Sequence, residues 1–162
     1  MQNTRICFIG AGNMGRSLIG GLIANAYPAE LLSAADPDAS QRQQLASLFN
    51  VSVYENNEQA LAGAEVVVLA VKPQAMRATL RGMLDGIQRA QALVVSIAAG
   101  IRLSAISAII GEDMPIIRVM PNTPSLIQPD SCPYRAHDGL GKLTLLILDL
   151  LIGKQRCSSG LD

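Results

Sequence analysis

A glycine-rich segment near the start of the chain limits most narrowly what the chain can fold into. Residues 10–15, GAGNMG, have the spacing GxGxxG. They follow a short apolar run at residues 6–9 and precede a stretch in which apolar residues recur at helical spacing. The spacing alone is weak evidence, but between a strand and a helix it is typical of a phosphate-binding turn. The segment therefore predicts a strand, a tight glycine turn and a helix whose N-terminus can face a phosphate group.

The three glycines of this motif have separate physical tasks. Gly10 permits the tight turn, and Gly12 lets the backbone approach a pyrophosphate with no Cβ in the way. Gly15 allows the helix to pack closely on the strand. The alternative is a glycine turn between strand and helix that binds no ligand. The position of a later carboxylate, Asp36, argues against that alternative.

Asp36 lies 21 positions after Gly15, where the second apolar run ends. A carboxylate at this place can accept hydrogen bonds from a ribose 2′-hydroxyl, and its other possible role is that of a turn residue in Asp-Pro-Asp. It favours NAD over NADP because it repels a 2′-phosphate. Arg42 could offset this effect if its side chain reaches back, so the sequence leaves the choice open.

Short apolar runs alternate with helical stretches over residues 1–127. In the run at 64–71, residues 66–71 are apolar without alternation, which is typical of a strand covered on both faces. We interpret the run at 92–98 as another buried strand. This order predicts an α/β fold, a doubly wound and mostly parallel Rossmann-type sheet with helices on both faces. The predicted strands are 6–9, 31–35, 51–53, 64–71, 92–98 and 115–120, and the predicted helices are 14–26, 40–49, 58–62, 74–87 and 103–110.

Helical spacing also predicts which faces of the first two helices are buried. The expected apolar stripes are Met14, Leu18, Leu22 and Ala26 in the first helix, and Leu45, Leu48 and Phe49 in the second.

Composition excludes several classes of protein. The chain is 49% hydrophobic but 3% aromatic, so its core must be aliphatic. Thirteen basic residues balance thirteen acidic ones, which argues against binding to nucleic acid or an anionic membrane through bulk charge. No apolar run approaches the roughly 18 residues of a membrane span. Three cysteines without CxxC spacing and a single histidine argue against a disulfide framework or a metal site. We expect a cytoplasmic protein with no metal, nucleic acid or membrane partner.

Three further strand ends carry small, polar or rigid residues, at 70–73, 96–100 and 118–124. Ligands of a doubly wound sheet lie beyond the carboxyl ends of its strands. The alternatives are a solvated Lys72, tight packing around Gly100 and a rigid connector through two prolines. No Ser–His–Asp, Cys–His or paired-carboxylate set is visible. The lack of such a catalytic set fits hydride transfer, in which a cofactor supplies the reactive atom.

Four motifs then give a specific resemblance. GAGNMG, AVKPQ, SIAAGI and RVMPNTP occur in that order, and together they resemble the N-terminal domain of the pyrroline-5-carboxylate reductases. The resemblance covers residues 1–127 and implies an NADPH- or NADH-dependent enzyme. Such an enzyme transfers hydride to the C=N carbon of 1-pyrroline-5-carboxylate, a small-molecule substrate, and forms L-proline in proline biosynthesis.

The resemblance also implies the positions of the site. Asn122 and Thr123 match the loop near the reacting ring. The positions implied to contact the cofactor are Ile9, Gly10, Ala11, Gly12, Asn13, Met14, Gly15, Asp36, Asn56, Ala70, Val71, Lys72, Pro73, Ile97, Ala98 and Ala99.

Residues 128–162 do not match the family. They predict a loop followed by an apolar helix at 142–152, a short helical tail that we interpret as a divergent, truncated or out-of-frame ending. The family is homo-oligomeric through a substrate and dimer domain that finds no match here, so we expect residues 1–127 not to be competent alone. Two alternatives stay open: a non-catalytic NAD(P)-binding module or remnant, and a 3-hydroxyacid dehydrogenase, against which Pro-Asn-Thr-Pro at 121–124 speaks.

Overall fold

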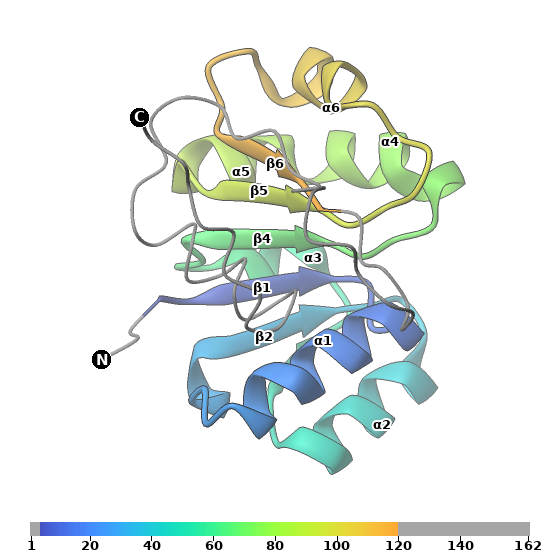
Figure 1. Cartoon of the computed structure of the whole chain (residues 1–162), viewed down its shortest axis with the longest axis vertical. Helices are drawn as coiled ribbons and strands as arrows, with labels where there is room; N and C mark the ends of the chain where they lie inside the picture. The colour runs from blue at the N-terminus through green and yellow to red at the C-terminus, as the bar shows by residue number, and fades with distance from the viewer. Residues whose placement is uncertain (1–3, 120–162) are drawn as a thin grey trace, which may run out of the picture.

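The computed structural model describes residues 4–119 of the chain. Strands and helices alternate along this part (Figure 1). The elements are β1 (Ile6–Ile9), α1 (Asn13–Ala24), the 3-10 helix η1 (Ala29–Leu31), β2 (Leu32–Ala35), α2 (Ala39–Phe49), β3 (Ser52–Tyr54), α3 (Asn57–Leu61), β4 (Val66–Leu69), α4 (Pro73–Gly82), α5 (Leu84–Ala90), β5 (Leu93–Ser96), α6 (Leu103–Ile110) and β6 (Ile116–Arg118).

The strands of this part form one parallel sheet in the order β3-β2-β1-β4-β5-β6. The chain first builds outward from β1 through β2 to β3, and then crosses back to β4 on the other side of β1 (Figure 1). In doubly wound sheets, ligands bind at such a reversal, beyond the carboxyl ends of the strands, which here are those of β1 and β4. The predicted fold class is confirmed.

Helices cover both faces of the sheet. On one face α1 and α2 pack over Ile6 and Phe8 of β1, and on the other α3, α4, α5 and α6 pack over Cys7 and Ile9. Figure 1 shows α1 and α2 in front of β1 and β2, with α3 behind them. Every residue of β1 and β4 is buried, which explains why these strands are apolar without alternation.

The buried helix faces agree with the predicted stripes only in part. Leu22 and Leu45 are fully buried, and Leu18 and Phe49 pack against the core. Helix α1 buries Gly15, Ile19 and Leu22, whereas Met14 is 36% exposed and Ala26 lies beyond the helix end. In α2 the predicted core residue Leu48 is 63% exposed. Close packing of helix on sheet begins at Gly15 because this residue has no side chain, and apolarity alone does not reveal that contact.

The predicted helix at 74–87 is two helices, α4 and α5, which are separated at Met83. The backbone of Met83 leaves helical geometry, with φ −126° and ψ 12°, and the Met83 side chain is fully buried. The break directs Met83 into the core and lets two short helices cover the sheet. Strand β4 is also shorter than predicted, so Ala70 and Val71 lie in the connection after it.

Some predictions fall outside the described residues. These are the helix at 142–152 and the positions of Asn122 and Thr123. Among residues 4–119, no helix has the length and apolarity needed to cross a membrane. Within the same range, no three His, Cys, Asp or Glu residues are grouped so that they could hold a metal ion.

Because the thiol of Cys7 is buried, we predict that the free energy of unfolding decreases at alkaline pH. Burial raises the pKa of Cys7 from 9.0 to about 12, and a hydrogen bond with Ser33 offsets part of the increase. Because the pKa of Cys7 is higher in the folded chain than in the unfolded chain, the contribution of this thiol to the free energy of unfolding is complete below pH 9. It is lost as the pH rises toward 12. Between pH 7 and pH 10 we expect the free energy of unfolding to fall by about 1.4 kcal/mol through this residue. Urea denaturation at both pH values measures it, and the Cys7→Ala variant should lack this part of the decrease. An equal decrease in both proteins would contradict the prediction.

Candidate dinucleotide-binding site

The turn after β1 is held against the neighbouring strands by main-chain contacts. The Gly10 amide donates to the Ala35 carbonyl at the end of β2, at 2.8 Å, and the Ala70 amide after β4 donates to Ile9 at 2.8 Å. Gly10 has φ +103°, and a Cβ added to it would lie 2.8 Å from the Ala70 carbonyl oxygen. The turn therefore needs glycine both for its conformation and for its contact with the end of β4.

The two other glycines differ in what surrounds them. A Cβ on Gly15 would lie 2.3 Å from the Gly10 carbonyl oxygen, so α1 packs directly on the turn. A Cβ on Gly12, the residue that precedes α1, would have no neighbour within 4 Å among residues 4–119. No side chain in this range caps α1, and its first turn carries no acidic residue. Within the part of the chain that the structure describes, the helix N-terminus is thus open where a pyrophosphate would lie, and these residues fit that group.

Asp36 joins the glycine turn to the connection between β2 and α2. Its Oδ2 accepts from the Ala11 amide at 2.8 Å, and its Oδ1 accepts from the Asp38 amide at 2.9 Å. Each carboxylate oxygen has a second lone pair, so the group can still accept from a ribose hydroxyl. The contact with Ala11 is not evident from the sequence, although the pairing of β1 with β2 brings the two segments together.

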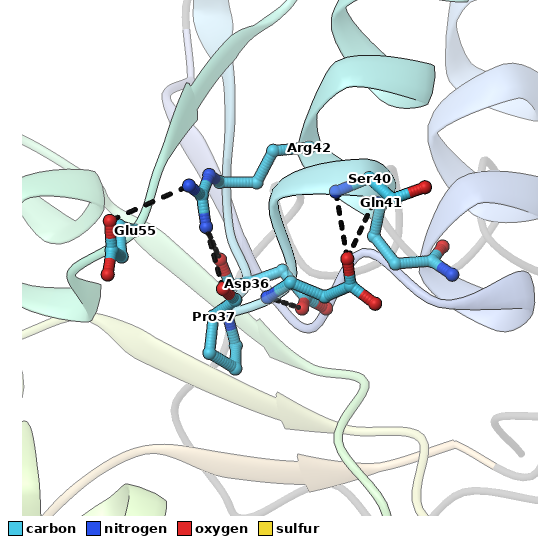
Figure 2. Close-up of polar contacts among 7 residues, drawn as sticks. Asp36, Pro37, Ser40, Gln41, Arg42 and Glu55 are labelled. Atoms are coloured by element: carbon cyan, nitrogen blue, oxygen red, sulfur yellow. Dashed lines mark hydrogen bonds and ion pairs between the residues drawn. The ribbon is translucent and has the colours of Figure 1, made fainter.

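Arg42 reaches back from α2, as the sequence allowed, but it meets carbonyl oxygens (Figure 2). Its Nη1 donates to the carbonyls of Asp36 at 2.7 Å and Pro37 at 2.9 Å. Its Nη2 lies 3.6 Å from Glu55 Oε2. The Arg42 side chain is 19% exposed and that of Glu55 is 78% exposed. The guanidinium therefore fixes the shape of the connection after β2.

Polar side chains near the turn also make contacts within the protein. Arg16 on α1 donates to Gln44 in the middle of α2, which joins the two helices, and to Asn13 on its own helix. Asn56 precedes α3 and accepts from the Glu58 amide at 2.7 Å, so its observed role is that of a helix cap.

The remaining positions lie after β4 and β5. Lys72 is exposed and precedes α4, with Pro73 as the first helical residue. Ile97 and Ala98 are each 7% exposed, and Ala99 is exposed. The parallel sheet thus brings Ile9–Gly15, Asp36, 70–73 and 97–99 to one edge, the carboxyl ends of its strands.

A parallel sheet in this order, with a tight glycine turn leading to an open helix N-terminus, defines a dinucleotide-binding domain. The chain belongs to the family described as "NADP oxidoreductase coenzyme F420-dependent", whose model matches residues 5–100.

Named relatives specify the resemblance further. The chain is 49% identical to the pyrroline-5-carboxylate reductase of Pseudomonas aeruginosa over 79% of its own length and 46% of that protein. The solved pyrroline-5-carboxylate reductase of Coxiella burnetii superposes with a TM-score of 0.81 at 29% identity, over 93% of this chain and 57% of that one. The Plasmodium falciparum enzyme with NADP bound shares the fold, with a TM-score of 0.71 at 24% identity over 93% and 55% of the two chains. The resemblance to the pyrroline-5-carboxylate reductases is confirmed. The chain spans about half the length of the curated relatives it matches.

The contacts of Asp36 predict that it stabilises the fold. The change Asp36→Ala leaves the amides of Ala11 and Asp38 without their acceptor, and we expect a loss of about 1–3 kcal/mol. Chemical denaturation measures the difference. Glu55→Ala is the control, because an exposed ion pair contributes only about 0–1 kcal/mol. Equal effects of the two changes would show that the Asp36 bonds do not hold the turn.

Proposed function

We propose that residues 1–127 form the NADPH- or NADH-binding domain of a reductase of the pyrroline-5-carboxylate reductase type. The proposed reaction reduces the C=N bond of 1-pyrroline-5-carboxylate to give L-proline. One observation carries the proposal: the open N-terminus of α1 beyond Gly12, in a chain 49% identical to such a reductase over 128 residues. A cytoplasmic location fits this function.

The residues of the sheet edge have separate parts in this proposal. The amides of the glycine turn and the first turn of α1 would hold the pyrophosphate, and Asp36 would accept from the adenosine ribose. The segments 70–73 and 97–99 would line the nicotinamide half. When bound, the reduced nicotinamide supplies the hydride. In the segment 97–99, Ile97 and Ala98 are buried and belong to the cores on opposite faces of the sheet.

We assign the contacts with the substrate to residues other than those at the carboxyl ends of the described strands. We propose that Asn122 and Thr123 lie near the reacting ring, as their match to the family motif suggests. We also propose that turnover needs a further substrate and dimer domain of the kind found in the family.

A titration followed by an assay tests the proposed function. NADPH and NADH are titrated separately into the purified chain and followed by nicotinamide fluorescence, and 1-pyrroline-5-carboxylate reduction is then measured. Binding of either cofactor supports the proposed domain, and turnover by this chain alone would contradict the need for a further domain. Binding without turnover is expected both for this domain and for a non-catalytic NAD(P)-binding module, and failure of both cofactors to bind would contradict the proposal.

A substitution at Gly12 separates the fold from the site. Gly12→Val places a branched side chain where the pyrophosphate would lie, and we expect cofactor affinity to fall more than tenfold. The fold should be unaffected, because φ −66° and ψ −172° at Gly12 suit valine and no atom lies within 4 Å of the added Cβ.

The matched control is Gly21→Val. Gly21 lies on the same helix, away from the turn, and an added Cβ there also has open space. This variant should bind like the unaltered chain. Unchanged affinity in Gly12→Val would show that the turn has only a structural role.

A further inference from the structure

We propose that this chain binds NADH in preference to NADPH, and that Asp36, Asp38 and the pair formed by Arg42 and Glu55 set this preference. The inference rests on the proposed function, since it presumes that a reduced dinucleotide binds at the glycine turn. The sequence alone leaves the choice open, because Arg42 could have turned toward a 2′-phosphate.

Negative charge dominates the place where the 2′-position would lie. In doubly wound sheets this position is beside the end of the second strand, which here is followed by Asp36 and Asp38. The two carboxylates belong to one short connection, in which Asp36 Oδ1 accepts from the Asp38 amide. A 2′-phosphate would bring a further anion to this connection, whereas a 2′-hydroxyl is neutral.

The N-terminus of α2 is already capped by the protein itself. Asp38 Oδ1 accepts from the Ser40 amide at 2.8 Å and from the Gln41 amide at 3.4 Å. Free amides at such a helix end are a common phosphate site. Here a carboxylate satisfies them and adds its own negative charge, so the helix offers little to a 2′-phosphate.

Two arginines of the described residues near this connection, Arg42 and Arg16, have partners within the protein. Arg42 is the single basic residue between positions 36 and 58. Its guanidinium donates to the carbonyls of Asp36 and Pro37, pairs with Glu55 and is 19% exposed. Arg16, on the neighbouring helix α1, donates to Gln44 and Asn13. The carbonyls thus take both donors of Arg42 Nη1, and a 2′-phosphate would compete with the Glu55 carboxylate for the charge of this guanidinium.

The same arrangement suits a ribose hydroxyl. Asp36 uses one lone pair of each oxygen for the amides of Ala11 and Asp38, and it retains acceptors for a hydroxyl donor. A hydroxyl can donate to this carboxylate, but a fully ionised phosphate cannot.

Parallel titrations of the full chain with NADH and NADPH test the preference. At one pH and one salt concentration, we expect the Kd for NADH to be at least tenfold lower than that for NADPH. Equal or tighter binding of NADPH would overturn the inference and leave the proposed function standing. Failure of both cofactors to bind would overturn the inference together with the proposed function.

Two variants test the residues that are assigned to the preference. Asp38→Ser keeps a side-chain cap for α2 but removes the charge, and Glu55→Gln removes the charge that faces Arg42. In the double variant we expect the affinity for NADPH to rise at least fivefold, with little change for NADH.

The control is Glu30→Gln, which removes one exposed negative charge in η1, before β2 and so at the opposite end of that strand. It should leave the ratio of the two affinities unchanged. The assignment would be wrong if the double variant and the control gave the same ratio.

Discussion

The contact between Gly10 and the end of β4 fixes the position of the whole candidate site. A side chain at Gly10 would meet the Ala70 carbonyl, so the turn lies directly on the neighbouring strand. Gly15 then packs on the turn and determines where α1 crosses the sheet. These two close approaches place the helix N-terminus beside the carboxyl ends of β1 and β4. The other strand ends lie on the same side of the domain because the strands are parallel.

Much of this arrangement is predictable from the sequence, for a physical reason. A strand buried on both faces is expected to be apolar throughout, and β1 and β4 have that pattern. A tight turn between a strand and a helix needs glycine at defined positions, so the motif fixes the local fold. The order of the elements then allows few topologies, and the doubly wound sheet is among them.

Details that depend on tertiary contacts are not predictable in the same way. Met14 and Leu48 have the apolarity and spacing of core residues, yet they are exposed because Gly15 and Leu45 mark the faces that meet the sheet. The sequence identifies Asp36 as a candidate ligand but not as the acceptor for Ala11, since that bond joins residues 25 positions apart. The direction of the Arg42 side chain likewise depends on carbonyl groups that only the folded connection presents.

The two hydrogen bonds of Asp36 constrain how such a domain can change during evolution. A residue that only contacted a ligand could be replaced freely when a different ligand became advantageous. Asp36 also holds the glycine turn, so its replacement would weaken the fold before any new specificity appeared. Asp38 and Glu55 are exposed, and a serine at position 38 can still cap α2. New ligand specificity is therefore more accessible through these two neighbours, while the carboxylate at position 36 is retained.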